Sequence, residues 1–151
     1  MRSVLALAFA VMATPALAAE PDPADRQQLL QLAERMDQAW TAGDADANAR
    51  LFAADATARF GGDPLGEGRE AIRLQFEGFF KDRPAGLRHV TGIERIERLG
   101  RGLALWDAEV RVERQQASGQ WATLTKIRNV TVAVRQRDGW RIKSVRAFPV
   151  Q

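Results

Sequence analysis

The sequence predicts an α+β fold in which three N-terminal helices pack on one face of an antiparallel sheet. The first half of the chain repeats apolar residues every three or four positions, which is the period of a helix. Beyond Pro84 the period falls to two, and Gly-containing turns separate the runs, a pattern typical of antiparallel strands. A length of 151 residues is enough for one domain with its own core. Helices followed by strands indicate the α+β class.

The first predicted helix ends at Ala42. Gly43 suits a left-handed C-cap, and Asp44 is suited to cap a second, short helix over about residues 45–52. The apolar face of the first helix is formed by Leu29, Leu32, Ala33, Met36 and Trp40.

A short strand is predicted over residues 55–60, followed by a Gly-rich turn over 61–68 that contains Asp63-Pro64. A third helix is predicted over 69–80. Its apolar residues follow helical spacing, and we expect all four to be buried: Ile72, Phe76, Phe79 and Phe80.

The rest of the chain predicts four strands. Residues 87–99 repeat apolar side chains every three positions, which we interpret as a strand with a bulge. Residues 104–112 alternate between apolar and charged side chains, the pattern of a half-buried strand. Hairpin turns at Ser118-Gly119 and Asp138-Gly139 lead into strands over 121–136 and 140–150.

The composition excludes several kinds of site. With no Cys and one His, the chain has no disulfide, no thiolate nucleophile and no multi-histidine metal site. The net charge is only +3 and basic residues are spread among acidic ones, which argues against binding to nucleic acid. Residues 66–71 match a dinucleotide-binding pattern, but no buried strand precedes them. We therefore expect no metal and no cofactor.

The first 18 residues have the three parts of a secretory signal peptide. Arg2 is the positive start, residues 4–13 are apolar, and Ala16-Leu17-Ala18 is an A-x-A cleavage site. The apolar stretch is too short to span a membrane. We expect cleavage after Ala18, a periplasmic or secreted protein that is free of the membrane, and a single domain over residues 19–151.

Four segments resemble the nuclear transport factor 2-like superfamily. Within it, the SnoaL-like branch and its small SgcJ/EcaC-like proteins of unknown function are the most similar. The segments are Trp40-Thr41-Ala42-Gly43-Asp44 and residues 51–57, 68–72 and 137–142. The resemblance implies a cone-shaped curved antiparallel sheet with packed helices, a ligand held in the cone, and a homodimer formed through the sheet. Members of the superfamily include isomerases, dehydratases, cyclases and domains that only bind, so the fold alone assigns no activity.

The resemblance also allows the ketosteroid isomerase mechanism to be examined position by position. The catalytic Tyr of that mechanism falls on Met36, the proton-shuttling Asp on Phe60, and the protonated Asp near Asn129. The chain contains no Tyr, so this set of residues is absent. Asp63 lies three residues beyond the base position and is a weak catalytic candidate in a turn.

Two groups of residues are candidates for the ligand site. Apolar walls are expected from Phe60, Phe76, Phe80 and Trp106, and polar contacts from His89, Arg128 and Arg146. His89 is either a strand histidine bonded to the backbone or an acid–base group in the pocket. Arg128 and Arg146 share strand faces with apolar residues. Each therefore faces a polar cavity, pairs with a carboxylate such as Asp107 or Glu109, or reaches solvent.

Three functions remain open from the sequence. The leading hypothesis is an exported domain that binds a small, mostly apolar molecule with a polar or anionic end. The first alternative is an enzyme of the isomerase, cyclase or lyase type that acts on enolisable carbonyl compounds, with His89 or Asp63 as proton carrier. The second alternative is a structural dimerisation module with a filled cone.

Overall fold

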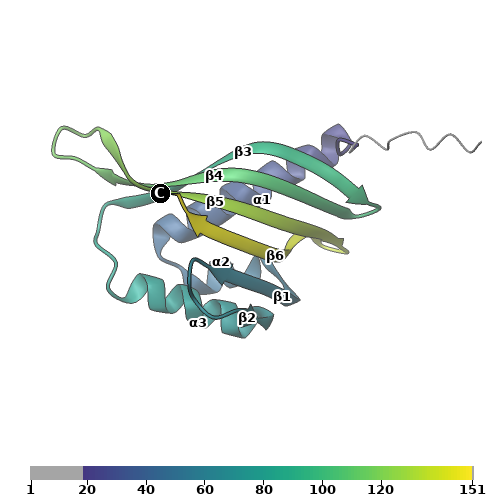
Figure 1. The fold of residues 1–151 in the computed structure, drawn as a ribbon, viewed down its shortest axis with the longest axis horizontal. Coiled ribbons are helices and arrows are strands. Elements are labelled where there is room, and N and C mark those ends of the chain that lie inside the picture. Colours follow the sequence, from purple (N-terminus) through teal and green to yellow (C-terminus); the bar gives the residue numbers. More distant parts are fainter. Residues whose placement is uncertain (1–18, 151) are drawn as a thin grey trace, which may run out of the picture.

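The computed structural model describes residues 19–150, so the predicted signal peptide, residues 1–18, lies outside the described residues. Helices α1 and α2 come first, α3 follows a short strand pair, and four long strands complete the fold (Figure 1). The elements are α1 (Pro23–Ala42), α2 (Ala45–Arg50), β1 (Phe52–Phe60), β2 (Gly66–Glu67), α3 (Gly68–Lys81), β3 (Leu87–Gly100), β4 (Leu103–Gln115), β5 (Trp121–Gln136) and β6 (Gly139–Pro149).

The predicted helix boundaries depend on capping residues, and the structure confirms them at the junction of α1 and α2. Gly43 adopts a φ of 71°, and its N–H donates to the Trp40 carbonyl at 3.0 Å. The Asp44 side chain accepts from the Ala47 N–H at 2.7 Å and caps α2. Helix α2 ends at Arg50, and β1 begins at Phe52 instead of Asp55. Phe52 already pairs with Ile142 of β6, its side chain is fully buried, and its carbonyl accepts from Arg69.

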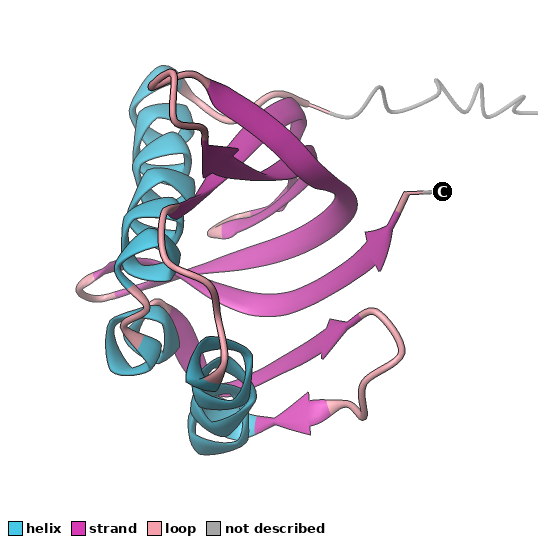
Figure 2. Ribbon diagram, turned by 90° about the vertical axis from the view of Figure 1, so that its left-hand side faces the viewer, coloured by secondary structure: helices cyan, strands magenta, loops and turns pink. Residues whose placement is uncertain are grey.

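The described strands form one curved sheet in the order β2-β1-β6-β5-β4-β3. Neighbouring strands are antiparallel except for β1 and β6, which are parallel. The turn predicted over residues 61–68 contains the two-residue strand β2, which pairs with β1. All three helices lie on one side of the sheet (Figure 2). The predicted α+β class with three helices on one face of a curved sheet is confirmed.

The structure confirms the bulge predicted in β3 and the alternation of buried residues predicted in β4. The predicted bulge in β3 lies between Ile93 and Arg95, where the register with β4 shifts. Along β4 the alternate residues are buried as expected: Ala104, Trp106, Ala108, Val110 and Val112. In α3, Ile72 and Phe76 are buried as predicted. Phe80 is only half-buried, and Phe79 is exposed because it lies at the rim of a cavity, where its ring meets that of Phe60.

Candidate active site

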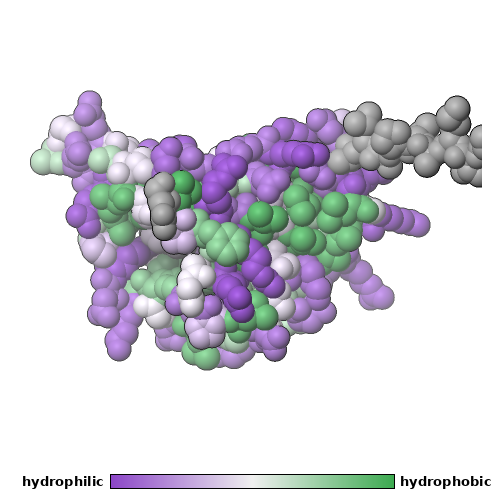
Figure 3. Space-filling model, viewed as in Figure 1, coloured by the Kyte–Doolittle hydropathy of each residue, from purple (hydrophilic) through white to green (hydrophobic). Residues whose placement is uncertain are grey.

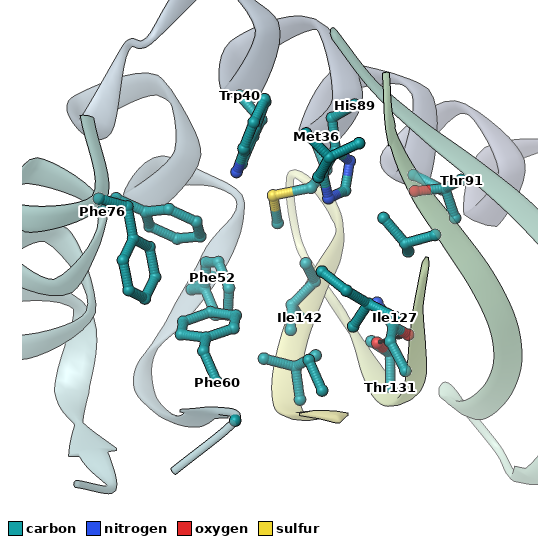
Figure 4. A pocket seen from close by; sticks show the side chains of 18 of the residues that line it. Met36, Trp40, Phe52, Phe60, Phe76, His89, Thr91, Ile127, Thr131 and Ile142 are labelled. Atoms are coloured by element: carbon teal, nitrogen blue, oxygen red, sulfur yellow. Dashed lines mark hydrogen bonds between the residues drawn. The ribbon is translucent and has the colours of Figure 1, made fainter. Parts of the chain in front are cut away.

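A cavity of about 430 Å³ lies between α1, α3 and the concave face of the sheet. The cone is therefore not packed solid. Figure 4 shows aromatic side chains from β1 and α3 on one wall and residues of α1 and β3 on another. The Phe60 and Phe76 rings are 5.3 Å apart, and neighbouring rings meet edge to face. Large apolar side chains from α1, β1 and α3 line this part of the cavity: Met36, Trp40, Phe52, Phe60, Phe76 and Phe79.

The polar lining of the cavity is small and contains no cation. Among the described residues that line it, none is Lys or Arg. Polar or acidic side chains are contributed by Asp63, His89, Thr91, Asn129 and Thr131. A mostly apolar cavity with a few convergent polar groups is typical of a small-molecule site.

His89 is paired with a carboxylate in the cavity wall. Its Nδ1 lies 2.6 Å from Oδ1 of Asp37, which is on α1. Because a carboxylate only accepts hydrogen bonds, Nδ1 carries the hydrogen of the neutral ring and Nε2 keeps a free lone pair. The two side chains are largely shielded, with 12% of His89 and 19% of Asp37 exposed. Figure 4 shows the imidazole at the cavity wall beside Met36.

The Asp37 carboxylate is itself held in place by β3. Its Oδ2 accepts from the Thr91 N–H at 2.7 Å, and its Oδ1 accepts from the Thr91 hydroxyl at 2.6 Å. Asp37 therefore has three hydrogen bonds to β3. One is with His89, and two are with Thr91, which lies two positions further along the strand. This arrangement fixes the carboxylate that in turn fixes the imidazole.

The end of α1 adds further support around His89. The His89 N–H donates to the Thr41 hydroxyl at 3.1 Å, and the Trp40 ring lies 5.0 Å from the imidazole. Arg83 donates to the Trp40 and Thr41 carbonyls, and its guanidinium lies 4.7 Å from the centre of the Trp40 ring. Burial lowers the pKa of Arg83. These contacts join the end of α1 to both the α3–β3 loop and the start of β3.

Most of the apolar predictions agree with the structure. Phe60, Phe76 and Trp106 line the cavity, as do His89 and Asp63. The positions matched to the isomerase residues, Met36, Phe60 and Asn129, also all line it, although their chemistry differs.

Two of the candidate residues, Phe80 and Asp63, lie outside the cavity and at its edge, respectively. Phe80 is not among the lining residues and instead packs against Trp40 and Phe76, each with ring centres 5.9 Å apart. Asp63 is exposed in the turn after β1, where its N–H donates to the Phe60 carbonyl at 3.1 Å. It therefore lies at the edge of the site.

The expectation that Arg128 and Arg146 point into the cavity is wrong. Arg128 lies on the outer face of β5, where it pairs with Glu94, and this carboxylate raises the pKa of Arg128. Arg146 lies on the outer face of β6 and donates to the Thr57 hydroxyl at 3.3 Å and the Val145 carbonyl at 2.7 Å. The more apolar face of β5, with Val130, Val132 and Val134, is the outer one, and the inner face carries Ile127, Asn129, Thr131 and Ala133.

Sequence reasoning missed Asp37 and Thr91. Asp37 follows Met36, which lines the cavity, but helical spacing places it at the edge of the polar face, where an Asp is expected to be solvated. The signal that would find it is the pairing of the only His with a carboxylate, and 52 positions separate the two in the sequence. Their proximity depends on how α1 crosses β3.

Residues 19–150 contain neither a membrane-spanning helix nor a cluster of metal ligands. No helix in this part of the chain is long and apolar enough to cross a membrane. Within the same residues, no group of three or more His, Asp or Glu is placed to hold a metal ion.

Comparisons with known proteins agree on the fold. A family model described as a SnoaL-like domain matches residues 22–146. A domain of unknown function with a cystatin-like fold from Nostoc punctiforme is 20% identical, with 87% of this chain and 80% of that chain covered and a TM-score of 0.75. A nuclear transport factor 2-like protein from Novosphingobium aromaticivorans is 22% identical, with 85% and 83% covered and a TM-score of 0.71.

A third similar structure was solved with a bound molecule. It is a protein from Catenulispora acidiphila in complex with S-DNPA, 20% identical, with 83% of this chain and 93% of that chain covered and a TM-score of 0.69. A comparison with curated proteins gave no significant match. At these identities the solved structures show a shared fold, and the family model covers most of the sequence. The chain therefore belongs to the SnoaL-like domain family, within the nuclear transport factor 2-like superfamily.

Proposed function

We propose that the chain binds a small, largely apolar molecule in its cavity and catalyses proton transfer on it, with His89 as the general base. The observation that carries this proposal is the pairing of His89 with Asp37 in the cavity wall. It favours the isomerase or lyase type of enzyme over a domain that only binds. A similar fold solved in complex with S-DNPA supports the binding part of the proposal.

His89 and Asp37 have different roles in this reaction. Nε2 of His89 takes a proton from a carbon of the substrate, and the electron pair of that C–H bond stays on the substrate. Asp37 is a positioning residue that keeps the hydrogen of the neutral ring on Nδ1 and stabilises the imidazolium that forms. Return of the proton to another carbon gives an isomerase. If the C–H electron pair instead forms a C=C bond while a leaving group on the neighbouring carbon departs with the pair of its own bond, the reaction is that of a lyase.

The apolar lining contributes by excluding water. A bound substrate contacts aromatic side chains such as Phe60 and Phe76 and displaces solvent from around Nε2. The site therefore suits the transfer of a proton between two positions of one molecule.

Proton exchange tests this proposal without knowledge of the natural substrate. We choose β-tetralone, a neutral bicyclic ketone with acidic C–H bonds, and follow exchange of its α protons in D₂O by ¹H NMR. The wild-type protein is expected to accelerate exchange, and His89→Gln to lose about 10²-fold or more of that acceleration. Asp37→Asn is expected to lose about 10²-fold, because the amide does not fix the tautomer of the ring.

Asp46→Asn, the same change at an exposed site on α2, is the matched control and is expected to keep the wild-type rate. Circular dichroism and thermal unfolding of all variants establish that they are folded. A wild-type rate equal to that of buffer contradicts the catalytic proposal. So does a His89→Gln variant that retains the full rate.

We further propose that the protein is exported, is cleaved after Ala18, and forms a homodimer through the outer face of the sheet. The three-part pattern of residues 1–18 supports export. Exposed apolar side chains on neighbouring strands, Val130 at 38% and Phe148 at 48% exposure, support the dimer. Figure 3 shows this side of the molecule, with apolar patches between charged ones. The mass of the mature N-terminus tests the cleavage site.

A further inference from the structure

A second apolar surface lies outside the cavity, along helix α3. It is an open groove between α3 and the turn that joins β1 to β2, and Figure 1 shows these elements side by side. Residues 63–66 line the groove on the side of the turn. On the helix, the lining residues are spaced by three or four positions and form one continuous stripe: Ala71, Leu74, Gln75, Gly78 and Phe79.

The groove begins at the rim of the cavity. Asp63 and Phe79 line both spaces. The Phe79 ring packs edge-on against Phe60 and Phe76, with ring centres 5.5 and 6.2 Å apart, while 39% of Phe79 stays exposed. Phe79 therefore stands between the cavity and the groove, and a molecule in the cavity that extends past this ring reaches the groove.

The turn is held against α3 by the side chain of Gln75. Its Nε2 donates to the Pro64 carbonyl at 2.9 Å. Its Oε1 is buried and lies so close to Gly66 that a Cβ added there would be only 2.4 Å away. This contact fixes the position of the turn beside the helix, so the groove is formed before a ligand arrives. Among the described residues that line the groove, Asp63 is the only charged one.

Gly78 lies within this stripe, and packing gives no reason for a glycine there. Its φ is not positive, and an added Cβ would meet nothing within 4 Å. A glycine inside a helix is less stable than an alanine, because the unfolded chain loses more conformational freedom on folding. A ligand that occupies the groove accounts for this glycine, since any side chain at the position would fill the same space.

We infer that the groove binds a hydrocarbon chain of the ligand whose head lies in the cavity. The inference rests on the proposed function and names the class of ligand: a molecule with a compact head and an uncharged apolar tail. Leu74 and Phe79 are five positions apart, which is about 7.5 Å along the helix and about the length of a hexyl chain. Burial of the chain against Leu65, Leu74 and Phe79 supplies affinity. The Asp63 carboxylate at the junction disfavours an anionic tail.

Two neutral probes with the same head test the inference. 2-Naphthol has a bicyclic head, and 6-hexyl-2-naphthol carries a hexyl chain on that head. Isothermal titration calorimetry measures the affinity of the wild-type protein for both. The hexyl compound is expected to bind about 30–100-fold more tightly, which corresponds to half-burial of each methylene group in the groove.

Gly78→Met and Ala71→Met fill the groove from two positions of the stripe, and neither residue lines the cavity. Each variant is expected to weaken binding of 6-hexyl-2-naphthol by about 10-fold and to keep the affinity for 2-naphthol within about twofold of wild type. Glu77→Met is the matched control, because it places the same side chain beside Gly78 but outside the groove. It is expected to keep both affinities. Thermal unfolding establishes that all three variants are folded.

Three results would overturn the inference. The first is a hexyl chain that adds no affinity in the wild-type protein, and the second is a gain from the chain that both groove variants retain in full. The third is self-association that Leu74→Glu abolishes, which would place a second copy of the chain on the groove.

The inference and the proposed function fail separately. Exchange of β-tetralone protons that needs His89, together with naphthol binding that is independent of the chain, keeps the proposed function and removes the groove from the site. Tight binding of 6-hexyl-2-naphthol that both groove variants weaken, without catalysed exchange, supports the groove and contradicts the proton-transfer proposal.

Discussion

At the scale of single residues, Glu113 is a buried carboxylate held by two arginines. It lies at the bulge where the register of β4 and β5 shifts and is only 7% exposed. Its Oε1 accepts from Nε of Arg111 at 2.9 Å and its Oε2 lies 2.6 Å from Nη2 of Arg88. Hydrogen bonds from the two guanidinium groups, first Arg111 and then Arg88, lower the pKa of Glu113.

Glu113→Gln is expected to lower the free energy of unfolding by about 1–2 kcal/mol at neutral pH, because the charge-assisted bonds are lost. Since folding lowers the pKa of Glu113, its stabilisation is fully present above the pKa of the unfolded chain. It is lost as the pH falls through the lower, folded value. Urea unfolding at a series of pH values measures this. A difference between wild type and variant that stays constant into the acid range would contradict the assignment.

His89 and Asp37 show how much of the site the sequence predicts. His89 is recognisable because it is the only His in the chain and lies at the start of a strand. Asp37 is one of several acidic residues on α1, and its role depends on the packing of α1 against Thr91 of β3. Asn129 was matched to the site only by resemblance. Its side chain is hydrogen-bonded to that of Thr131, a contact that no sequence pattern indicates.

At the scale of elements, the C-cap of α1 supports the wall that holds His89. Gly43 has a positive φ, and a Cβ added there would lie 3.1 Å from Nη2 of Arg83, which binds the last carbonyls of α1. Gly43→Ala is expected to destabilise the protein by about 1–2 kcal/mol, as measured by urea unfolding.

Gly78, within α3, is the matched control because a Cβ there meets nothing within 4 Å and the backbone is helical. Gly78→Ala is expected to have the opposite sign and to stabilise the protein by about 0.5–1 kcal/mol. Equal effects of the two substitutions would show that backbone conformation is not the cause.

Short-range sequence patterns predict the individual helices and strands better than they predict how the strands pair in the sheet. Capping residues, helical spacing and hairpin turns are encoded within a few positions, and the elements at Gly43, Asp44 and Gly139 agree with them. The parallel pairing of β1 and β6 joins residues about 90 positions apart and has no turn of its own. The face of β5 was misassigned because its outer side is the more apolar one, and the side facing the cavity carries Asn129 and Thr131.

At the scale of the whole molecule, the outer face of the sheet is the proposed interface between two copies of the chain. Val130 and Phe148 are diagonal neighbours on this face, since Val130 pairs with Arg146 and Phe148 with Arg128. Val130→Glu is expected to convert the proposed dimer to a monomer at micromolar concentration, because it places a charge in an apolar contact. Sedimentation velocity measures the oligomeric state.

Leu74→Glu is the control for this experiment. Leu74 is also exposed and apolar but lies on α3, away from the outer face of the sheet. The variant is expected to sediment like the wild-type protein. A wild-type monomer, or a dimer lost equally in both variants, would contradict association through the sheet.

The pairing of β1 with β6 also has a consequence for biosynthesis. Strand β1 and the last strand, β6, are neighbours in the sheet, and β6 joins β1, β2 and α3 to the meander of β3, β4 and β5. A nascent chain that still lacks residues 139–149 cannot complete this sheet, so its helices have no finished surface to cover. The sheet can therefore be completed only after residues 139–149 have been synthesised, and until then no strand joins β1, β2 and α3 to β3, β4 and β5.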